Sequence, residues 1–179
     1  ERSLPEKAVI ITFDDGYASF ITYAFPVLHS YGYKATINII GHYVNGYVQD
    51  GGTRPMLSWD EYRHLAKSGL VSLGCHTDRL HVFRRKGVIG ASETELLDDL
   101  QGFQDRYTQE IGRPCNIIAW PYGFYDDKSI SVAYKAGFRY YLTSKIGLYE
   151  RLKDSKEIPR INIGEDTGLF DLQSKIGAH

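Results

Sequence analysis

Two adjacent carboxylates, Asp14 and Asp15, stand directly after a short apolar run and before Gly16. Neighbouring side chains of an extended backbone point to opposite faces, so one carboxylate can bind a cation while the other faces a reacting group. Asp and Gly are also common turn residues, and a solvated turn is the alternative interpretation of Asp-Asp-Gly. The position of the pair at the end of a buried strand pattern favours the chemical interpretation.

A pair of histidines, His76 and His81, follows another apolar run, and the two are five residues apart. This spacing does not place both rings on one face of a helix, so a loop must bend back to bring them together. One carboxylate and two imidazoles leave coordination positions open, as catalytic divalent metal sites do. A histidine pair in a loop is by itself more often solvated or hydrogen-bonded, and its combination with the aspartate pair favours a metal site.

A turn, Pro121-Tyr122-Gly123, follows a further apolar run. The N–H of Tyr122, held between Pro and Gly, can point at an oxyanion that develops during a reaction. An ordinary turn fits these three residues equally well, so the motif gains meaning only from the other two.

The motifs stand at the ends of short apolar runs that alternate with amphipathic stretches, a pattern typical of repeated βα units. We expect strands at residues 8–13, 35–40, 71–75, 116–120 and 139–143, a weaker strand at 158–163, and helices at 17–30, 58–67, 92–111 and 127–135. Ser-x-x-Glu capping boxes begin two of these helices, at Ser58 and at Ser92. Parallel βα folds bind ligands at the carboxyl ends of their strands, so the motifs are expected to meet at that edge.

Length and composition narrow the class of protein. A chain of 179 residues fits one domain, and we expect residues 1–179 to be a single domain cut from a longer protein, because the chain begins at Glu1 and not at Met. No apolar run approaches the roughly 18 residues of a membrane-spanning helix. With 21 Lys and Arg against 22 Asp and Glu, the chain has no basic field for nucleic acid. Its 14 tyrosines offer flat faces that suit sugar rings.

Taken in order, the three motifs resemble those of the polysaccharide deacetylases, the NodB-homology domains of carbohydrate esterase family 4. The matching residues are Thr12-Phe13-Asp14-Asp15-Gly16, His76-Thr77 with a second His, and Pro121-Tyr122-Gly123, and they span most of the chain. The resemblance implies an α/β fold of the NodB-homology type, an irregular (β/α) barrel with fewer than eight βα units. It also implies an extracellular or cell-envelope location.

The resemblance further implies roles for the matching residues. Asp14 would be the general base, Asp15 with His76 and His81 would bind one divalent metal ion, and the backbone N–H of Tyr122 would donate to an oxyanion. Zinc is the expected ion, with cobalt or nickel as alternatives, because two imidazoles and a carboxylate do not discriminate among these metals.

The chain departs from the family pattern at three places. The five-residue spacing of His76 and His81, in place of four, is similar to that of the biofilm poly-β-1,6-N-acetylglucosamine N-deacetylases. Ala119 stands where many members have an arginine that pairs with the catalytic Asp, and we expect Arg160 to substitute for it. The Leu-x-His that supplies a general acid has no clean counterpart, since His179 lies one residue too far. In the similar branch, the acidic His comes from a segment upstream of Asp-Asp-Gly.

The expected function is metal-dependent, hydrolytic N-deacetylation of an N-acetylglucosamine polysaccharide, with poly-β-1,6-N-acetylglucosamine as the expected polymer. An O-acetyl esterase acting on xylan or another glycan is one alternative, because the same groups serve when only the leaving atom changes. A non-catalytic carbohydrate-binding domain is another, favoured by the missing acid and by aromatic residues expected at the surface, Tyr43, Tyr47, Trp59, Trp120 and Tyr125. A magnesium-dependent βα hydrolase is disfavoured, since two His ligands do not suit an ion that prefers oxygen.

Overall fold

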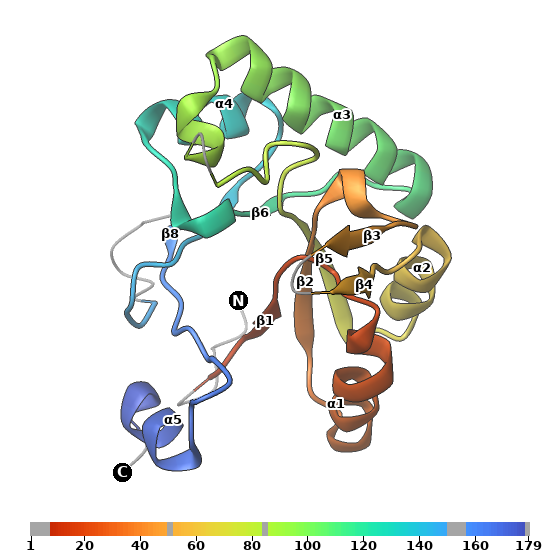
Figure 1. Cartoon of the computed structure of the whole chain (residues 1–179), viewed down its shortest axis with the longest axis vertical. Coiled ribbons are helices and arrows are strands. Elements are labelled where there is room, and N and C mark those ends of the chain that lie inside the picture. Colours follow the sequence, from red (N-terminus) through yellow and green to blue (C-terminus); the bar gives the residue numbers. More distant parts are fainter. Residues whose placement is uncertain (1–7, 50–51, 84–85, 150–156, 178–179) are drawn as a thin grey trace, which may run out of the picture.

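A curled parallel sheet forms the centre of the structure, a computed structural model that describes residues 8–49, 52–83, 86–149 and 157–177. Its six strands are β1 (Ile11–Phe13), β2 (Ala35–Ile39), β5 (Val71–Cys75), β6 (Ile117–Ala119), β7 (Tyr140–Leu142) and β8 (Glu157–Ile158), adjacent in that order. All neighbouring pairs are parallel, and within the described residues no ladder joins β8 back to β1. The sheet is an open half-barrel (Figure 1), which confirms the predicted α/β barrel with fewer than eight units.

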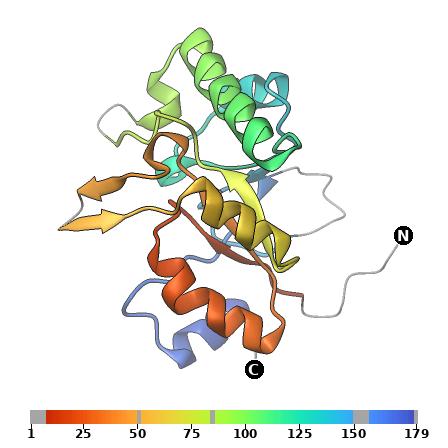
Figure 2. The same cartoon turned by 90° about the vertical axis from the view of Figure 1, so that its right-hand side faces the viewer.

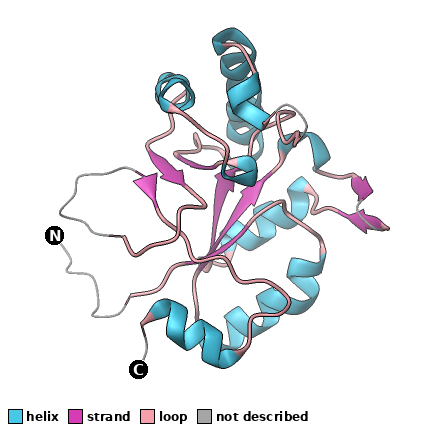
Figure 3. Ribbon diagram, turned by 60° about the vertical axis from the view of Figure 1, so that its left-hand side comes forward, coloured by secondary structure: helices cyan, strands magenta, loops and turns pink. Residues whose placement is uncertain are grey.

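Helices lie around the outer side of this sheet (Figure 3). They are the π-helix η1 (Phe20–Ala24), α1 (Phe25–Tyr31), α2 (Trp59–Lys67), α3 (Glu93–Ile111) and α4 (Asp127–Lys135), and α5 (Leu169–Ile176) follows near the carboxyl end of the chain. The expected capping boxes begin α2 and α3, where the side chains of Ser58 and Ser92 accept hydrogen bonds from backbone N–H groups. No helix in the described part of the chain is long and apolar enough to cross a membrane.

The apolar core lies between the sheet and the helices. Ile37 and Ile39 of β2 and Leu100 and Phe103 of α3 are almost completely buried there. Residues of a strand alternate between its two faces, so Asn38, between the two isoleucines, points to the concave side of the sheet. That side is the more polar one, and the candidate site lies at its rim.

The first helix differs from the one expected at residues 17–30. It begins only at Phe20, as the π-helix η1. Tyr17 instead forms an antiparallel bridge with Met56, and the N–H of Ala18 donates to the carbonyl oxygen of Pro55 at 2.9 Å. This pairing with a distant segment keeps the first residues out of the helix.

A hairpin occupies part of the segment between the second expected strand and the second expected helix. β3 (Tyr47–Gln49) and β4 (Thr53–Pro55) pair in antiparallel fashion and project away from the main sheet (Figure 2). Most of their residues are exposed, so they carry no alternating apolar pattern from which strands can be predicted. The helix α5 was not predicted for the same reason, since none of its residues is buried.

The last strand is shorter than the one expected at residues 158–163. It ends at Ile158, because Pro159 has no N–H with which to extend the ladder. The chain then leaves the sheet, and Arg160 turns toward β1.

Two of the aromatic residues expected at the surface are buried. Trp59 and Trp120 are 7% and 1% exposed. The Trp120 ring stacks against the rings of Tyr125 and Tyr141, so it belongs to the core and does not offer a face to sugar. This weakens the argument from surface aromatics for a purely carbohydrate-binding domain.

Candidate active site

Polar residues from several strand ends meet at the carboxyl edge of the sheet. Asp14 and Asp15 follow β1, His76 follows β5, Tyr122 follows β6 and Arg160 follows β8. The sequence predicted this edge as the meeting place of the three motifs, and the family resemblance predicted the position of Arg160. The structure brings them together although up to 146 positions separate them in the chain.

The backbone is strained where three of these strands end. Asp15, Thr77 and Tyr122 have φ angles of 71°, 69° and 56°, in the left-handed region that non-glycine residues rarely adopt. Each non-glycine residue in this conformation lowers the stability of the folded state by roughly 1–3 kcal/mol, and such residues are concentrated at functional sites. The sharp reversals turn the strand-end residues toward one another.

Asp15, His76 and His81 form a group whose ligand atoms all lie within 4.8 Å of one another. The Nε2 atoms of His76 and His81 are 3.5 Å and 3.4 Å from Oδ1 of Asp15. Ligands bound about 2.1 Å from a tetrahedral ion are themselves roughly 3.4 Å apart, so these separations match those around a divalent metal. The residues and their geometry therefore fit such an ion.

The two histidines are oriented through their Nδ1 atoms. Nδ1 of His76 lies 2.8 Å from the carbonyl oxygen of Ala119, to which it donates, so the Nε2 lone pair faces Asp15. Nδ1 of His81 lies 3.2 Å from the hydroxyl of Tyr122. Burial lowers the pKa of both imidazoles, which keeps them neutral and able to bind a metal.

The loop that carries the histidines is fixed by residues that the sequence analysis did not single out. The carboxylate of Asp99, on α3, accepts hydrogen bonds from the backbone N–H groups of Asp78 and Arg79 at 2.9 Å and 2.7 Å. The Sγ of Cys75 accepts from the N–H of Thr77 at 3.2 Å. A carboxylate within an amphipathic helix looks like an ordinary exposed residue in the sequence, which hides this role.

Asp14 is held differently from Asp15. Its Oδ1 accepts from Nη1 of Arg160 at 2.8 Å and from Nδ2 of Asn38 at 2.7 Å, and its Oδ2 accepts from Nη2 of Arg160 at 2.8 Å. Burial alone would raise the pKa of Asp14, but the hydrogen bonds and positive charge of Arg160, with further contributions from His76 and Asn38, lower it from 3.8 to about 2. Asp14 is therefore ionised at neutral pH.

Arg160 also bridges the open side of the half-barrel. Its Nε donates to the carbonyl oxygen of Thr143 at 3.0 Å, and its Nη1 lies 3.3 Å from Oγ1 of Thr12 on β1. The guanidinium thus connects the β7–β8 side of the sheet to β1 where no ladder does. The contact with Asp14 is the one expected when Arg160 takes the place of the family's arginine.

Asn38 is the contact of Asp14 that the sequence analysis missed. It is completely buried on β2, and its Oδ1 has no hydrogen-bond partner among the described residues. A Cβ added to Gly74 on the next strand would collide with this Oδ1, so the glycine provides the space for the Asn38 amide. A single Asn within the apolar run Ala-Thr-Ile-Asn-Ile was the available signal.

Tyr122 lies at the edge of the site within the turn η4 (Pro121–Gly123). Its ring centroid is 4.6 Å from that of His81. The turn is closed by a hydrogen bond from the N–H of Gly123 to the carbonyl oxygen of Trp120 at 3.0 Å. Gly123 has a φ of 71°, and a Cβ there would collide with the side chain of Ser144, so glycine is required.

His179, considered in the sequence analysis as a general acid, lies outside the described residues, as do residues 1–7. Within the described part of the chain, the group that could bind a metal contains only His76 and His81 as histidines.

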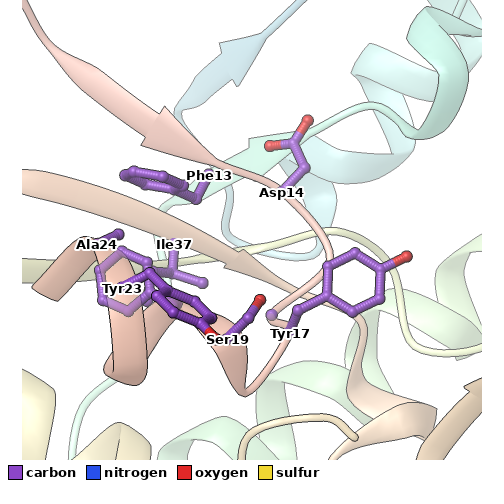
Figure 4. A pocket seen from close by; sticks show the side chains of 9 residues that line it. Phe13, Asp14, Tyr17, Ser19, Tyr23, Ala24 and Ile37 are labelled. Carbon is purple, nitrogen blue, oxygen red and sulfur yellow. The ribbon is translucent and has the colours of Figure 1, made fainter. Parts of the chain in front are cut away.

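A pocket of about 200 Å³ lies on the other side of β1, between this strand and η1. Its lining includes the aromatic residues Phe13, Tyr17, Phe20 and Tyr23. Asp14 also lines this pocket, and Figure 4 shows its carboxylate pointing away from Tyr23 and Ser19. The two oxygens of this carboxylate are hydrogen-bonded to Arg160 and Asn38.

Comparison with known proteins identifies the family to which this chain belongs. A family model described as polysaccharide deacetylase matches residues 1–141. The chain belongs to the polysaccharide deacetylase family. The motifs at Asp14, His76 and Tyr122 all fall within the matched residues, whereas Arg160 lies beyond them.

Two similar family members come from bacteria. YxkH of Bacillus subtilis, provisionally named a polysaccharide deacetylase, is 30% identical over 165 residues, which cover 91% of this chain and 54% of that protein. A poly-β-1,6-N-acetyl-D-glucosamine N-deacetylase of Staphylococcus aureus is 29% identical over 167 residues, covering 90% of this chain and 56% of that protein. The chain thus spans about half the length of these relatives.

The fold also matches solved deacetylase structures. A de-N-acetylase from Aggregatibacter actinomycetemcomitans superposes with a TM-score of 0.84 and 25% identity, covering 97% of this chain and 77% of that one. This agreement extends over nearly all of the chain and includes the open half-barrel.

Proposed function

We propose that this domain hydrolyses the acetamide of N-acetylglucosamine residues in a polysaccharide, which releases acetate and leaves an amine on the sugar. The observation that carries the proposal is the different setting of two adjacent carboxylates, Asp15 beside two histidines and Asp14 beside Arg160 and Asn38. Family membership and the similarity to the Staphylococcus aureus protein support poly-β-1,6-N-acetylglucosamine as the polymer. Such a substrate supports an extracellular or cell-envelope location.

One divalent metal ion would be held by Asp15, His76 and His81. Zinc is the ion we propose, and cobalt or nickel suits the same ligands. When bound, the ion supplies Lewis-acid polarisation of the acetyl carbonyl and a lowered pKa for the attacking water. Neutral imidazoles and an ionised Asp15 are the protonation states that this binding requires.

Asp14 is the proposed general base. Its Oδ1 accepts two hydrogen bonds and its Oδ2 accepts one, so Oδ2 has more lone-pair capacity left to take a proton from water. The paired hydrogen bonds from Arg160 fix the plane of the carboxylate and keep it ionised until the proton arrives.

The remaining steps concern the tetrahedral oxyanion and the leaving amine. The backbone N–H of Tyr122 is the proposed donor to the oxyanion, as in the family motif. The amine needs a proton before it departs, and the two candidates for the acid are His179 and a histidine from a segment upstream of Asp-Asp-Gly. Comparing this chain with a longer natural form, together with His179→Ala, separates the two.

Acetate release tests the proposed function. The substrates are β-1,6- and β-1,4-linked N-acetylglucosamine oligomers and O-acetylated xylan, each incubated with native protein, EDTA-treated protein and Asp14→Asn. We expect release from the N-acetylglucosamine oligomers, its loss with EDTA and its return with zinc. Release from xylan alone would instead indicate an O-acetyl esterase. Glycan binding without release, unchanged by EDTA, would indicate a carbohydrate-binding domain.

A further inference from the structure

Three aromatic side chains extend outward from the candidate metal site, and we call Phe83, Tyr122 and Phe124 the aromatic ridge. The ring centroids of Phe83 and Tyr122 are 5.2 Å apart in an edge-to-face contact. Phe124 completes the ridge, with its centroid 5.9 Å from Phe83 and 6.1 Å from Tyr122. At the inner end, the Tyr122 ring contacts the ring of His81. The ridge is therefore continuous with the ligand group.

Two of the three rings of the ridge are open to solvent, and Phe124 is half-buried. Phe83 is 64% exposed and Tyr122 is 46% exposed. Isolated exposed apolar residues are normal on protein surfaces, whereas rings in mutual contact beside a site of chemistry indicate a ligand-binding surface. Residues of this kind are typical of the lining of small-ligand sites.

The backbone around Phe83 is hydrogen-bonded on both sides of the residue. The N–H of Val82 donates to the carbonyl oxygen of Leu80 at 2.8 Å, and the N–H of Gly87 donates to that of Val82 at 2.8 Å. The N–H of Lys86 donates to the carbonyl oxygen of Phe83 at 3.0 Å. Because the backbone there is already ordered, less conformational entropy is lost when a ligand packs on the Phe83 ring.

We propose that the aromatic ridge is a stacking subsite for the pyranose ring next to the reacting sugar, with Phe83 as the residue that contacts it. Pyranoses present faces of C–H groups that pack against flat aromatic rings, and an acetylated, uncharged polymer suits a surface made of rings. The Tyr122 ring lies between those of His81 and Phe83, with ring centroids 4.6 Å and 5.2 Å away. Phe83 is therefore within reach of a sugar residue next to the one that reacts. This inference rests on the proposed function and specifies which part of the polymer the protein recognises.

Three variants of Phe83 test the subsite. Phe83→Ala removes the ring, Phe83→Leu keeps apolar volume without a flat face, and Phe83→Tyr keeps the face. Phe170→Ala is the matched control, since Phe170 is 81% exposed on α5. Each protein is assayed on a β-1,6-linked N-acetylglucosamine tetramer and on the monosaccharide, with metal content measured in parallel.

We expect Phe83→Ala to lower kcat/KM on the tetramer about three- to tenfold, mainly by raising KM. The loss of one aromatic contact typically weakens binding by about this factor. The ratio of kcat/KM for tetramer over monosaccharide should fall by the same factor. In Phe83→Leu this ratio should fall as much as in Phe83→Ala, and in Phe83→Tyr it should stay close to the native ratio. Phe170→Ala should have the native kcat/KM on both substrates. Metal content should be equal in all of them.

Several results would overturn the subsite. Full tetramer preference in Phe83→Leu would show that only apolar volume matters. A fall in kcat with loss of metal would make Phe83 a structural support for Tyr122. Sedimentation with phosphatidylglycerol vesicles that Phe83→Ala abolishes, without a change in KM, would assign the ridge to a membrane surface.

A binding measurement separates this inference from the proposed function. Calorimetry with the tetramer on Asp14→Asn, alone and combined with Phe83→Ala, reports binding without turnover. If the native protein releases no acetate from any glycan, the proposed function fails while the binding comparison still decides the ridge. A three- to tenfold weaker Kd in the double variant supports the subsite, and equal Kd values overturn it.

Discussion

Asp14 and Asp15 are neighbours in the chain but belong to two differently built regions. On the metal side, with Asp15, His76 and His81, the ring of His76 is oriented by a main-chain group, the carbonyl oxygen of Ala119 on β6. The base side, with Asp14, is supported by side chains, and Arg160 reaches it from beyond the open edge of the sheet. The first support is part of the parallel sheet itself. The second depends on two side chains, Asn38 of the neighbouring strand β2 and Arg160 far away in the sequence.

This difference determines how each region should respond to substitution. Changes at the metal side should appear as metal loss, whatever residue is altered. Changes at the base side should lower activity while metal content stays constant. The substitutions below test that separation, beginning with those of the largest expected effect.

Loss of a ligand should remove the metal. We expect Asp15→Asn, His76→Ala and His81→Ala each to weaken binding by more than the roughly 10- to 100-fold typical of losing an outer-shell partner. Metal content after dialysis against a metal buffer measures this effect. His64→Ala, an exposed histidine on α2, is the control and should keep native metal content. Full occupancy in all three ligand variants would mean that the metal, if any, binds elsewhere.

Loss of the base should abolish turnover and leave the metal. In Asp14→Asn the amide occupies the same volume but cannot accept a proton from water, so we expect a loss of roughly 100-fold or more in kcat. Metal content measured on the same sample should equal that of the native protein. If Asp14→Asn lost its metal and Asp15→Asn kept it, the roles of the two carboxylates would have to be exchanged.

Loss of the arginine should resemble loss of the base in a milder form. Arg160→Gln removes the paired hydrogen bonds that orient Asp14, and we expect kcat/KM to fall about 30-fold with metal content unchanged. Arg160→Lys should restore little, because an ammonium group cannot form two parallel hydrogen bonds with a carboxylate. Arg139→Gln, remote from the site at the amino end of β7, should behave as the native protein. Metal loss in Arg160→Gln would contradict the separation of the two regions.

Much of the metal side could be predicted from the sequence because its signals are local. Apolar runs followed by Asp-Asp-Gly and by His76 predict both the strands and the edge at which their ends meet. The capping boxes at Ser58 and Ser92 likewise lie within a few residues of the helices that they begin. Such features depend on neighbouring residues, so one sequence suffices to predict them.

The supports of the site were harder to predict because they act across large separations in the chain. Arg160 was expected opposite Asp14 only through the resemblance to a family, since nothing local marks that arginine. Asp99 anchors the histidine loop from a position that looks like ordinary helix surface. The hairpin of β3 and β4 is exposed on both faces, so no apolar periodicity predicts it. Asn38 is hard to predict for both reasons: its partner Asp14 is distant in the chain, and a single polar residue in a short strand forms no periodic pattern.

The smallest effect is expected at Asn38, the second support of Asp14. Asn38→Leu keeps the number and branching of the side-chain heavy atoms but removes the donor to Oδ1 of Asp14. A hydrogen bond to a charged group contributes about 1.5 kcal/mol or more, so we expect kcat/KM to fall about tenfold. Metal content should stay at the native value.

Two further variants distinguish positioning from a general defect of the strand. Thr36→Val, two residues earlier on the same face of β2, should keep native activity. Gly74→Ala should imitate Asn38→Leu, because its Cβ would occupy the place of the Asn38 amide oxygen. An unchanged rate in both Asn38→Leu and Gly74→Ala would show that Arg160 alone positions the base, and the base side would then depend on a single contact across the open edge.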